Sequence, residues 1–213
     1  ENNYEFIDNQ LGSNTNSGIA STFIKGAKLS GKQKKDMAVF EIDERSSIRI
    51  YPFMKPTYLI CTNLFRDSLM RNAHTEFISS MLTNNIPKET KLILNGDDLI
   101  VSNLAPDNER VYFGINRLDT DTDTCQNIAR DIIVCPKCDS KLKYEFVRYN
   151  HIGRAHCSKC DFSSPKIDYE VTNIDFENKK MTIAIIILII LIIAIVGFNF
   201  AFSEFNNKQT NIL

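Results

Sequence analysis

Four cysteines in two close pairs are the residues of this chain best suited to chemistry. Cys135 and Cys138 enclose a proline and a lysine, Cys157 and Cys160 enclose a serine and a lysine, and eighteen residues separate the pairs. Each Cys-x-x-Cys turn directs two thiolates to one point, and four thiolates form the tetrahedron that Zn²⁺ prefers. Four protein ligands leave no open position for water. We therefore predict a structural zinc site.

The residues between the cysteine pairs have the pattern of a hairpin. Leu142–Phe146 alternates like a strand, Asn150–Gly153 supplies a turn, and Arg154–His156 leads back to the second pair. This predicts a zinc ribbon over 131–166. Its core is small, so metal binding contributes its folding energy, on the order of 10 kcal/mol. A redox role fits less well, because a redox Cys-x-x-Cys needs one such pair rather than two.

The elements before the ribbon predict an α/β fold. Helical patterns around 76–82 and 98–104 separate the last three of four short apolar runs. Those runs are Met37–Ile42, Tyr58–Thr62, Lys91–Asn95 and Val111–Ile115. Apolar strands alternating with helices indicate a mostly parallel sheet with flanking helices. In such sheets, ligands bind at the carboxyl ends of the strands.

Polar side chains, most of them acidic or amide, lie at the carboxyl ends of the first three of these strands. They are Glu41, Asp43, Glu44, Thr62, Asn63, Asp67, Asn95, Asp97 and Asp98. Carboxylates at one sheet edge suit Mg²⁺ together with nucleotide phosphate oxygens. Alternatively, the same residues cap the following helices, where negative charge interacts favourably with the helix dipole. The pattern leaves both interpretations open.

Length and composition fit one globular domain plus a small module. The chain has 213 residues, of which 43% are hydrophobic and 24% charged. Its formal net charge of −1 argues against a general polyanion binder, so no nucleic acid partner is expected.

Several motifs occur in a specific order, namely Glu41–Glu44, Thr62–Asp67, Asn95–Asp98, Tyr112–Gly114, and the ribbon with Lys141–Tyr144 and Tyr149–Gly153. Together they resemble the MurT family, the Mur-ligase-like subunit of lipid II isoglutaminyl synthase. The resemblance runs roughly from Gly12 to Ile183. It implies a partial Mur ligase central, ATP-binding domain over 1–130, with the ribbon inserted before a return strand region over 167–180.

The resemblance implies an ATP-dependent carbon–nitrogen ligase of peptidoglycan biosynthesis. In this family, ATP activates the α-carboxylate of D-glutamate in the lipid II stem peptide as an acyl phosphate. Ammonia from a GatD-type glutaminase partner then displaces phosphate, which leaves the amide. The implied cofactors are ATP, Mg²⁺ and structural Zn²⁺, and the implied location is the cytoplasm, at the inner face of the membrane.

The resemblance also implies site residues. Glu41 matches a glutamate that binds Mg²⁺, and Asn95 with Asp98 matches a turn near the nucleotide. Asn14 and Ser17 match a stretch on the phosphate and substrate side of the cleft. The four cysteines match the ribbon's metal ligands, and no catalytic residue is assigned.

The chain departs from the family pattern at several points. Ser68 and Met70 replace a glutamine and an aspartate near the cation site. The family's Gly-Lys-Thr phosphate loop belongs before Glu1, and its C-terminal ligase domain belongs after the ribbon. We therefore expect this chain to be a fragment that does not turn over ATP by itself.

A hydrophobic segment over 181–202 precedes a polar tail over 203–213. Met181–Phe198 contains eighteen uncharged residues, nine of them isoleucine. As a helix it would span about 27 Å, close to the ~30 Å hydrocarbon core of a bilayer. Two interpretations stay open. The segment is either a C-terminal membrane helix with Lys179 and Lys180 on the cytoplasmic side, or a product of reading-frame loss.

An alternative function is a membrane-tethered zinc-ribbon module that binds nucleic acid or protein. Basic residues surround three aromatic ones in the ribbon, as on surfaces that bind single strands. They are Lys137, Lys141, Lys143, Arg148, Arg154 and Lys159, around Tyr144, Phe146 and Tyr149. The order of the motifs favours the ligase subunit instead.

Overall fold

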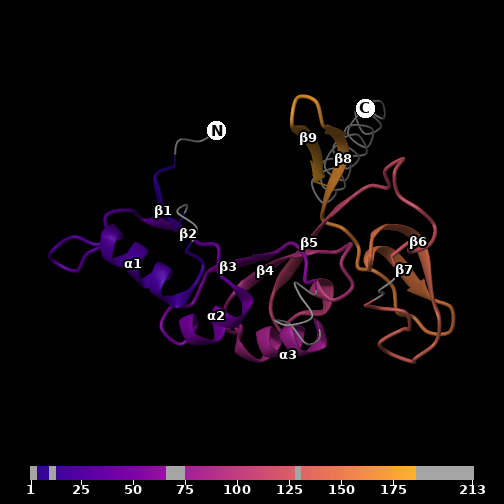
Figure 1. Ribbon diagram of the computed structural model, residues 1–213, viewed down its shortest axis with the longest axis horizontal. Coiled ribbons are helices and arrows are strands. Elements are labelled where there is room, and N and C mark those ends of the chain that lie inside the picture. Colours follow the sequence, from indigo (N-terminus) through magenta and orange to yellow (C-terminus); the bar gives the residue numbers. More distant parts are fainter. Residues whose placement is uncertain (1–3, 10–12, 66–74, 128–130, 186–213) are drawn as a thin grey trace, which may run out of the picture. The chain divides into compact units, whose positions relative to one another are not determined.

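The computed structural model describes residues 4–9, 13–65, 75–127 and 131–185. Figure 1 shows their helices and strands in chain order. The chain divides into two compact units. The first comprises residues up to 59 together with 64–91 and 103–109, and the second comprises 60–63, 92–102 and 110 onward.

The first unit contains a two-stranded parallel sheet and three helices. β1 (Phe6–Asp8) pairs with β2 (Met37–Val39), and α1 (Asn16–Gly26) lies between them in the chain. α2 (Glu44–Ile50) and α3 (Thr75–Asn85) follow. Asp43 caps α2, since its carboxylate accepts a hydrogen bond of 3.0 Å from the Ser46 backbone N–H. The capping interpretation is thus confirmed for Asp43.

A five-stranded sheet has the order β3-β4-β5-β8-β9. Its strands are β3 (Tyr58–Cys61), β4 (Lys91–Asn95), β5 (Arg110–Ile115), β8 (Tyr169–Asp175) and β9 (Lys180–Ile185). β4 with β5 and β5 with β8 run parallel, whereas β8 and β9 are antiparallel. The predicted α/β architecture with a mostly parallel sheet is therefore confirmed.

The alternation of buried and less buried side chains along β4 explains its central place in this sheet. Leu92 and Leu94 are 1% and 0% exposed, whereas Lys91 between the turn and Leu92 faces solvent. Because both leucines lie on one buried face, a slip of one residue would turn them to the other face, so this pattern fixes the register of β4. Asn95 ends the strand.

Residues 98–104 do not form the predicted helix. Within them the structure has only a 3₁₀ turn, η1 (Val101–Asn103). The Asp98 carboxylate accepts hydrogen bonds from the backbone N–H groups of Ile100 and Val101 at 2.8 and 3.0 Å. Such local bonds give the backbone an alternative to helical pairing, which explains the short turn.

The hydrophobic segment begins as a strand rather than a helix. Residues 181–185 are the end of β9 and pair with β8, so the return strand extends beyond 180. Thr182 and Ile183 suit a strand, because β-branched side chains fit a pleated surface. Residues 186–202 lie outside the described residues. Among the residues that are described, no helix has the length and apolar character needed to cross a membrane.

The ribbon is an antiparallel hairpin of β6 (Leu142–Tyr149) and β7 (Ile152–Cys157). Asn150 turns the chain with φ of 50°. A side chain at Gly153 would place its Cβ 2.1 Å from the Phe146 carbonyl oxygen, so only glycine fits there. The cysteine end of the hairpin has a small buried cluster, made of Leu99, Cys135, Leu142, Ala155 and Cys157.

Replacing Leu94 with alanine should destabilise the protein by about 2–5 kcal/mol, because the side chain is fully buried and leaves a cavity. Ile60→Ala on β3 is the matched control. Ile60 is 66% exposed, so its loss should cost less than about 1 kcal/mol. Urea unfolding of both variants measures the difference, and equal losses would contradict the described core.

Candidate functional site

The four ribbon cysteines converge as the zinc prediction requires. Their sulfur atoms all lie within 4.8 Å of one another. The Sγ atoms of Cys135 and Cys160 are 3.6 Å apart, and those of Cys138 and Cys157 are 3.5 Å apart. Zn–S bonds of about 2.3 Å in a tetrahedron imply sulfur separations of about 3.8 Å. The cluster therefore fits a closed, four-thiolate metal site.

Backbone and side-chain donors stabilise the thiolate forms of Cys138 and Cys157. The N–H groups of Lys137 and Lys159 point at the sulfurs of Cys135 and Cys157, at 3.4 and 3.3 Å. The Lys159 N–H lowers the pKa of Cys157. Hydrogen bonds from Ser140 lower the pKa of Cys138 to about 6. Since zinc binds the thiolate, these donors favour metal binding at neutral pH.

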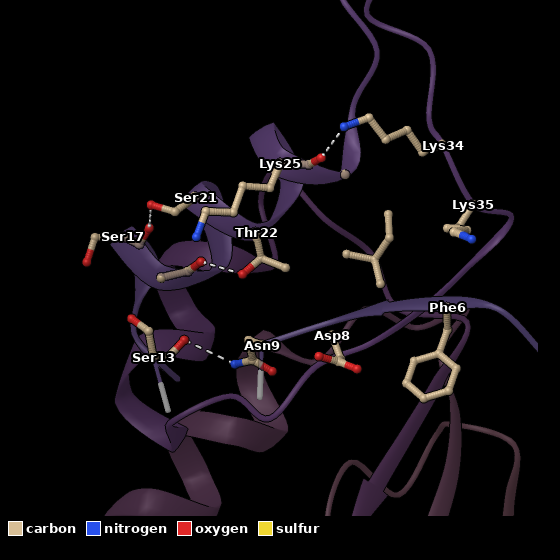
Figure 2. A pocket seen from close by; sticks show the side chains of 13 residues that line it. Phe6, Asp8, Asn9, Ser13, Ser17, Ser21, Thr22, Lys25, Lys34 and Lys35 are labelled. Atoms are coloured by element: carbon tan, nitrogen blue, oxygen red, sulfur yellow. Dashed lines mark hydrogen bonds between the residues drawn. The ribbon is translucent and has the colours of Figure 1, made fainter. Parts of the chain in front are cut away.

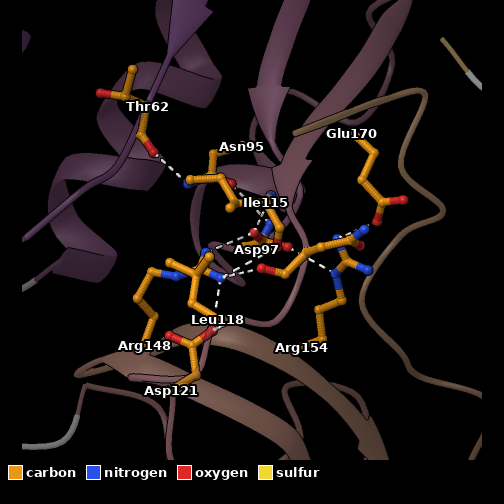
Figure 3. A network of polar contacts seen from close by, with 10 residues as sticks. Thr62, Asn95, Asp97, Ile115, Leu118, Asp121, Arg148, Arg154 and Glu170 are labelled. Atoms are coloured by element: carbon orange, nitrogen blue, oxygen red, sulfur yellow. Dashed lines mark hydrogen bonds and ion pairs between the residues drawn. The ribbon is translucent and has the colours of Figure 1, made fainter. Parts of the chain in front are cut away.

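A second cluster of polar groups surrounds the turn that follows β4 (Figure 3). The Asn95 side chain donates a hydrogen bond of 2.8 Å to the Thr62 carbonyl and accepts one of 2.9 Å from the Asp97 N–H. It therefore links the ends of β3 and β4. Asn95 is partly exposed at this edge, which is where the sequence predicts the nucleotide.

Asp97 is the central acceptor of this cluster. Its carboxylate is 1% exposed and accepts from the Ile115 N–H at 2.8 Å, from Arg148 at 3.1 Å and from Arg154 at 2.9 Å. Arg148 also contacts Asp121 at 2.9 Å, and Arg154 contacts Glu170 at 3.0 Å. Burial lowers the pKa of Arg154, but its bonds to Asp97 and Glu170 outweigh this and raise that pKa.

Asp98 is buried beside the ribbon turn. The residue is 0% exposed, and its Oδ1 lies 3.2 Å from Nε2 of His151. The other ring nitrogen of His151 lies 3.5 Å from an oxygen of Asp131. In this arrangement, Asp98 holds the turn and the ribbon together. Its predicted contact with a nucleotide stays a prediction.

Glu41, Asn14 and Ser17 lie in the first unit. Asn9 binds the backbone of Glu41 through both its amide atoms, at 3.0 and 2.8 Å. The Asn14 carbonyl accepts from the Asp43 N–H at 2.9 Å. The structure does not place this unit against Asn95 and Asp98, so a joint nucleotide and Mg²⁺ site of these five residues stays a prediction.

Ser17 lines an open cavity of about 590 Å³ beside α1 (Figure 2). The cavity is lined by hydroxyl groups of α1 and by three lysines. Its polar lining residues are Asp8, Asn9, Ser13, Ser17, Ser21, Thr22, Lys25, Lys34 and Lys35. Phe6 and Ile7 add apolar surface to this lining. The assignment of Ser17 to the substrate side stays a prediction.

Sequence reasoning missed the roles of Arg148, His151 and Arg154. Two of them were counted in the basic surface of the alternative nucleic-acid module. The side chains of Arg148 and Arg154 are instead 19% and 20% exposed and bind carboxylates. The spacing of Arg148 and Arg154 gave one usable signal. Two cations on either side of a hairpin turn can bind a single acidic partner.

Replacing Cys138 or Cys157 with serine should abolish stoichiometric zinc binding and unfold the ribbon, because three thiolates and a hydroxyl hold Zn²⁺ weakly. Metal analysis and circular dichroism of the purified protein measure both effects. Cys61→Ser and Cys125→Ser are the controls, since neither residue belongs to the cluster. Full zinc content in Cys157→Ser would contradict the assignment.

Acid should release the metal below pH 6, since Cys138 has a pKa of about 6 without metal and bound zinc competes with the proton for its thiolate. The pKa of Cys138 is about 6 in the folded ribbon and 9.0 as an ordinary thiol, so its thiolate contributes stability at high pH that protonation removes. Ser140→Ala should move the midpoint of zinc release to higher pH, by about half a unit. A zinc-sensitive dye measures release. Ser158→Ala, whose hydroxyl binds the Lys141 carbonyl, is the control and should keep the parent midpoint.

Comparison with known proteins identifies relatives of this chain. It is 33% identical over 176 residues to "Lipid II isoglutaminyl synthase (glutamine-hydrolyzing) subunit MurT" of Staphylococcus aureus strain COL, which covers 82% of this chain and 39% of the relative. The MurT subunit of Streptococcus pneumoniae is 32% identical over 172 residues, covering 80% of this chain and 38% of the relative. The chain thus spans about two fifths of the length of these relatives.

A solved structure supports the fold. The pseudomurein peptide ligase type C from Methanothermus fervidus matches with a TM-score of 0.51 and 23% identity, over 70% of this chain and 31% of the ligase. No protein-family model matches the chain. The two MurT subunits confirm the resemblance that the motifs indicated: over about four fifths of its length, this chain is similar to MurT subunits.

Proposed function

We propose that the protein containing this chain is the ligase subunit of a lipid II isoglutaminyl synthase. The observation that carries the proposal is the 33% identity to a MurT subunit over 176 residues. The four-cysteine cluster and the polar turn after β4 support it, because both were expected from the family's motifs. The partner would be a GatD-type glutaminase, and lipid II would be the substrate at the inner face of the membrane.

The proposed reaction has two steps. An oxygen of the D-glutamate α-carboxylate attacks the γ-phosphorus of ATP, which forms an acyl phosphate and releases ADP. Ammonia then attacks the acyl carbon, phosphate leaves, and a proton is lost to give the amide. Both steps develop negative charge on phosphate oxygens, so they need cations and hydrogen-bond donors in fixed positions.

Residues of this chain suit the binding part of that task. Glu41 offers a carboxylate for Mg²⁺, the hard cation that accompanies nucleotide phosphates. Its backbone is fixed by Asn9, which limits where the carboxylate can reach. Asn95 forms the polar end of β4, the position at which parallel sheets receive ligands. Asn14 and Ser17 are assigned to the substrate side, with the cavity beside α1 next to Ser17.

Zinc has a different role in this proposal. Four thiolates would complete its coordination, so zinc stabilises the ribbon and takes no part in the reaction. The membrane-tethered module is less well supported, because Arg148 and Arg154 are engaged with carboxylates and leave a smaller basic surface.

The test is amidation by the complete protein purified with its glutaminase partner. With lipid II, glutamine and Mg²⁺-ATP, mass spectrometry should show conversion of the D-glutamate α-carboxyl into a carboxamide. Two control reactions separate glutamine hydrolysis from amidation. One omits ATP, and the other supplies free ammonia in place of glutamine together with an inactive glutaminase. Amidation at a different carboxyl, or none with ammonia and ATP present, would refute the proposal.

Glu41→Gln should lower the amidation rate by about 10²-fold, because the neutral amide is a poor ligand for Mg²⁺. Raising the Mg²⁺ concentration should restore part of the rate. Glu44→Gln is the matched control, since Glu44 lies in the first turn of α2 and carries the same charge. A Glu41 variant with the parent rate and Mg²⁺ dependence would remove this residue from the cation site.

A further inference from the structure

The ribbon hairpin contacts the turn after β4 with its tip, at the end opposite the cysteines. The Gly153 N–H donates to the Asp97 carbonyl at 2.7 Å, and Ile152 forms a β-bridge with Asp98. His151 in the hairpin turn reaches Asp98 at 3.2 Å. Backbone and side chains of the tip therefore bind the same short segment of the sheet.

Two arginines reinforce this contact from adjacent strands. Arg148 comes from β6 and Arg154 from β7, and each binds a different oxygen of Asp97 (Figure 3). Both guanidinium groups also lie near the ring of Phe146, at 5.2 and 5.6 Å from its centroid. A planar guanidinium beside a ring has few alternative orientations. The ring of Phe146 thus helps to orient both arginines toward the carboxylate.

Each arginine joins Asp97 to a second anchor. Arg148 also binds Asp121 and the carbonyl groups of Ile115 and Asn116. Arg154 also binds Glu170 on β8. Since Asp97 accepts the Ile115 N–H as well, the network ties the ends of β4, β5 and β8 to the hairpin. The Asn95 side chain accepts a hydrogen bond from the Asp97 N–H, so the network also restricts the position of that side chain.

We propose that Arg148 and Arg154 are positioning residues that clamp the Asn95–Asp98 turn through Asp97, so that the ribbon sets the geometry of the nucleotide edge. The ribbon then does more than stabilise its own fold. Its hairpin carries the cysteine cluster at one end and the clamp at the other. The nucleotide part of this inference rests on the proposed function, whereas the clamp itself does not.

The clamp is tested by hydrogen exchange in the complete protein with zinc bound. Arg154→Met should speed exchange of the backbone amides of 96–101 by about 10-fold or more, because Asp97 loses one of two cationic partners and becomes an undercompensated buried charge. Zinc content should stay at the parent value. Arg117→Met is the matched control, since Arg117 binds Asp123 and the Glu145 carbonyl without touching Asp97.

Conservative variants separate position from charge. Arg154→Lys keeps the cation but cannot bridge Asp97 and Glu170 with a fixed fork, so exchange should be intermediate. Arg148→Lys provides an independent measurement if Arg154→Met does not fold. Parent exchange rates at 96–101 in both folded arginine variants would overturn the clamp.

The nucleotide part is tested by the affinity for Mg²⁺-ATP, measured by calorimetry, and by the kinetics of amidation. Arg154→Met should weaken ATP binding and raise the KM for ATP about 10-fold while kcat changes less than about 3-fold, because ATP is bound by a looser edge. Faster exchange with unchanged ATP affinity would overturn positioning toward the nucleotide. Tight ATP binding without amidation would instead refute the proposed function and leave this inference standing.

Discussion

The second unit of this protein depends on the contacts of one buried carboxylate, that of Asp97. An ionised group with 1% exposure is tolerated only where cations and N–H groups replace the water it has lost. Asp97 obtains them from β5 through Ile115 and from the ribbon through Arg148 and Arg154. The carboxylate also restricts which residue fits at position 114, because a Cβ on Gly114 would lie 2.9 Å from Oδ1 of Asp97. The residue therefore makes the ribbon a part of the sheet's own structure.

The ribbon itself needs support at both ends. Its buried cluster is small, and its two strands give few apolar contacts from which a hairpin could gain independent stability. Four thiolates close together hold one end when zinc is bound, and carboxylates in the sheet hold the other. Metal binding and ion pairing thus support the same hairpin at different places.

The parts of the structure set by local pattern were predictable from sequence. The Cys-x-x-Cys spacing predicted the sulfur cluster, and the apolar runs predicted the strands β3, β4 and β5. What failed depends on partners distant in sequence. Asp98 lies 53 residues from His151, and Asp97 lies 57 from Arg154, so neither ion pair leaves a periodic signal. The expected helix over 98–104 failed for a related reason, because the Asp98 carboxylate that caps the segment is fixed by the ribbon.

The same geometry explains what a polar turn at a sheet edge offers to a ligand. The Asn95 amide binds Thr62 and Asp97, and the Asp98 carboxylate binds two backbone N–H groups and His151. Because the Asn95 and Asp98 side chains already bind these groups, they act mainly by fixing the backbone around them. A fixed backbone loses little conformational entropy when a ligand binds, and it presents its groups in one orientation. In the proposed function, the polar residues at this edge would support ligand binding by fixing the backbone. The ribbon, whose arginines bind Asp97, would belong to the same support.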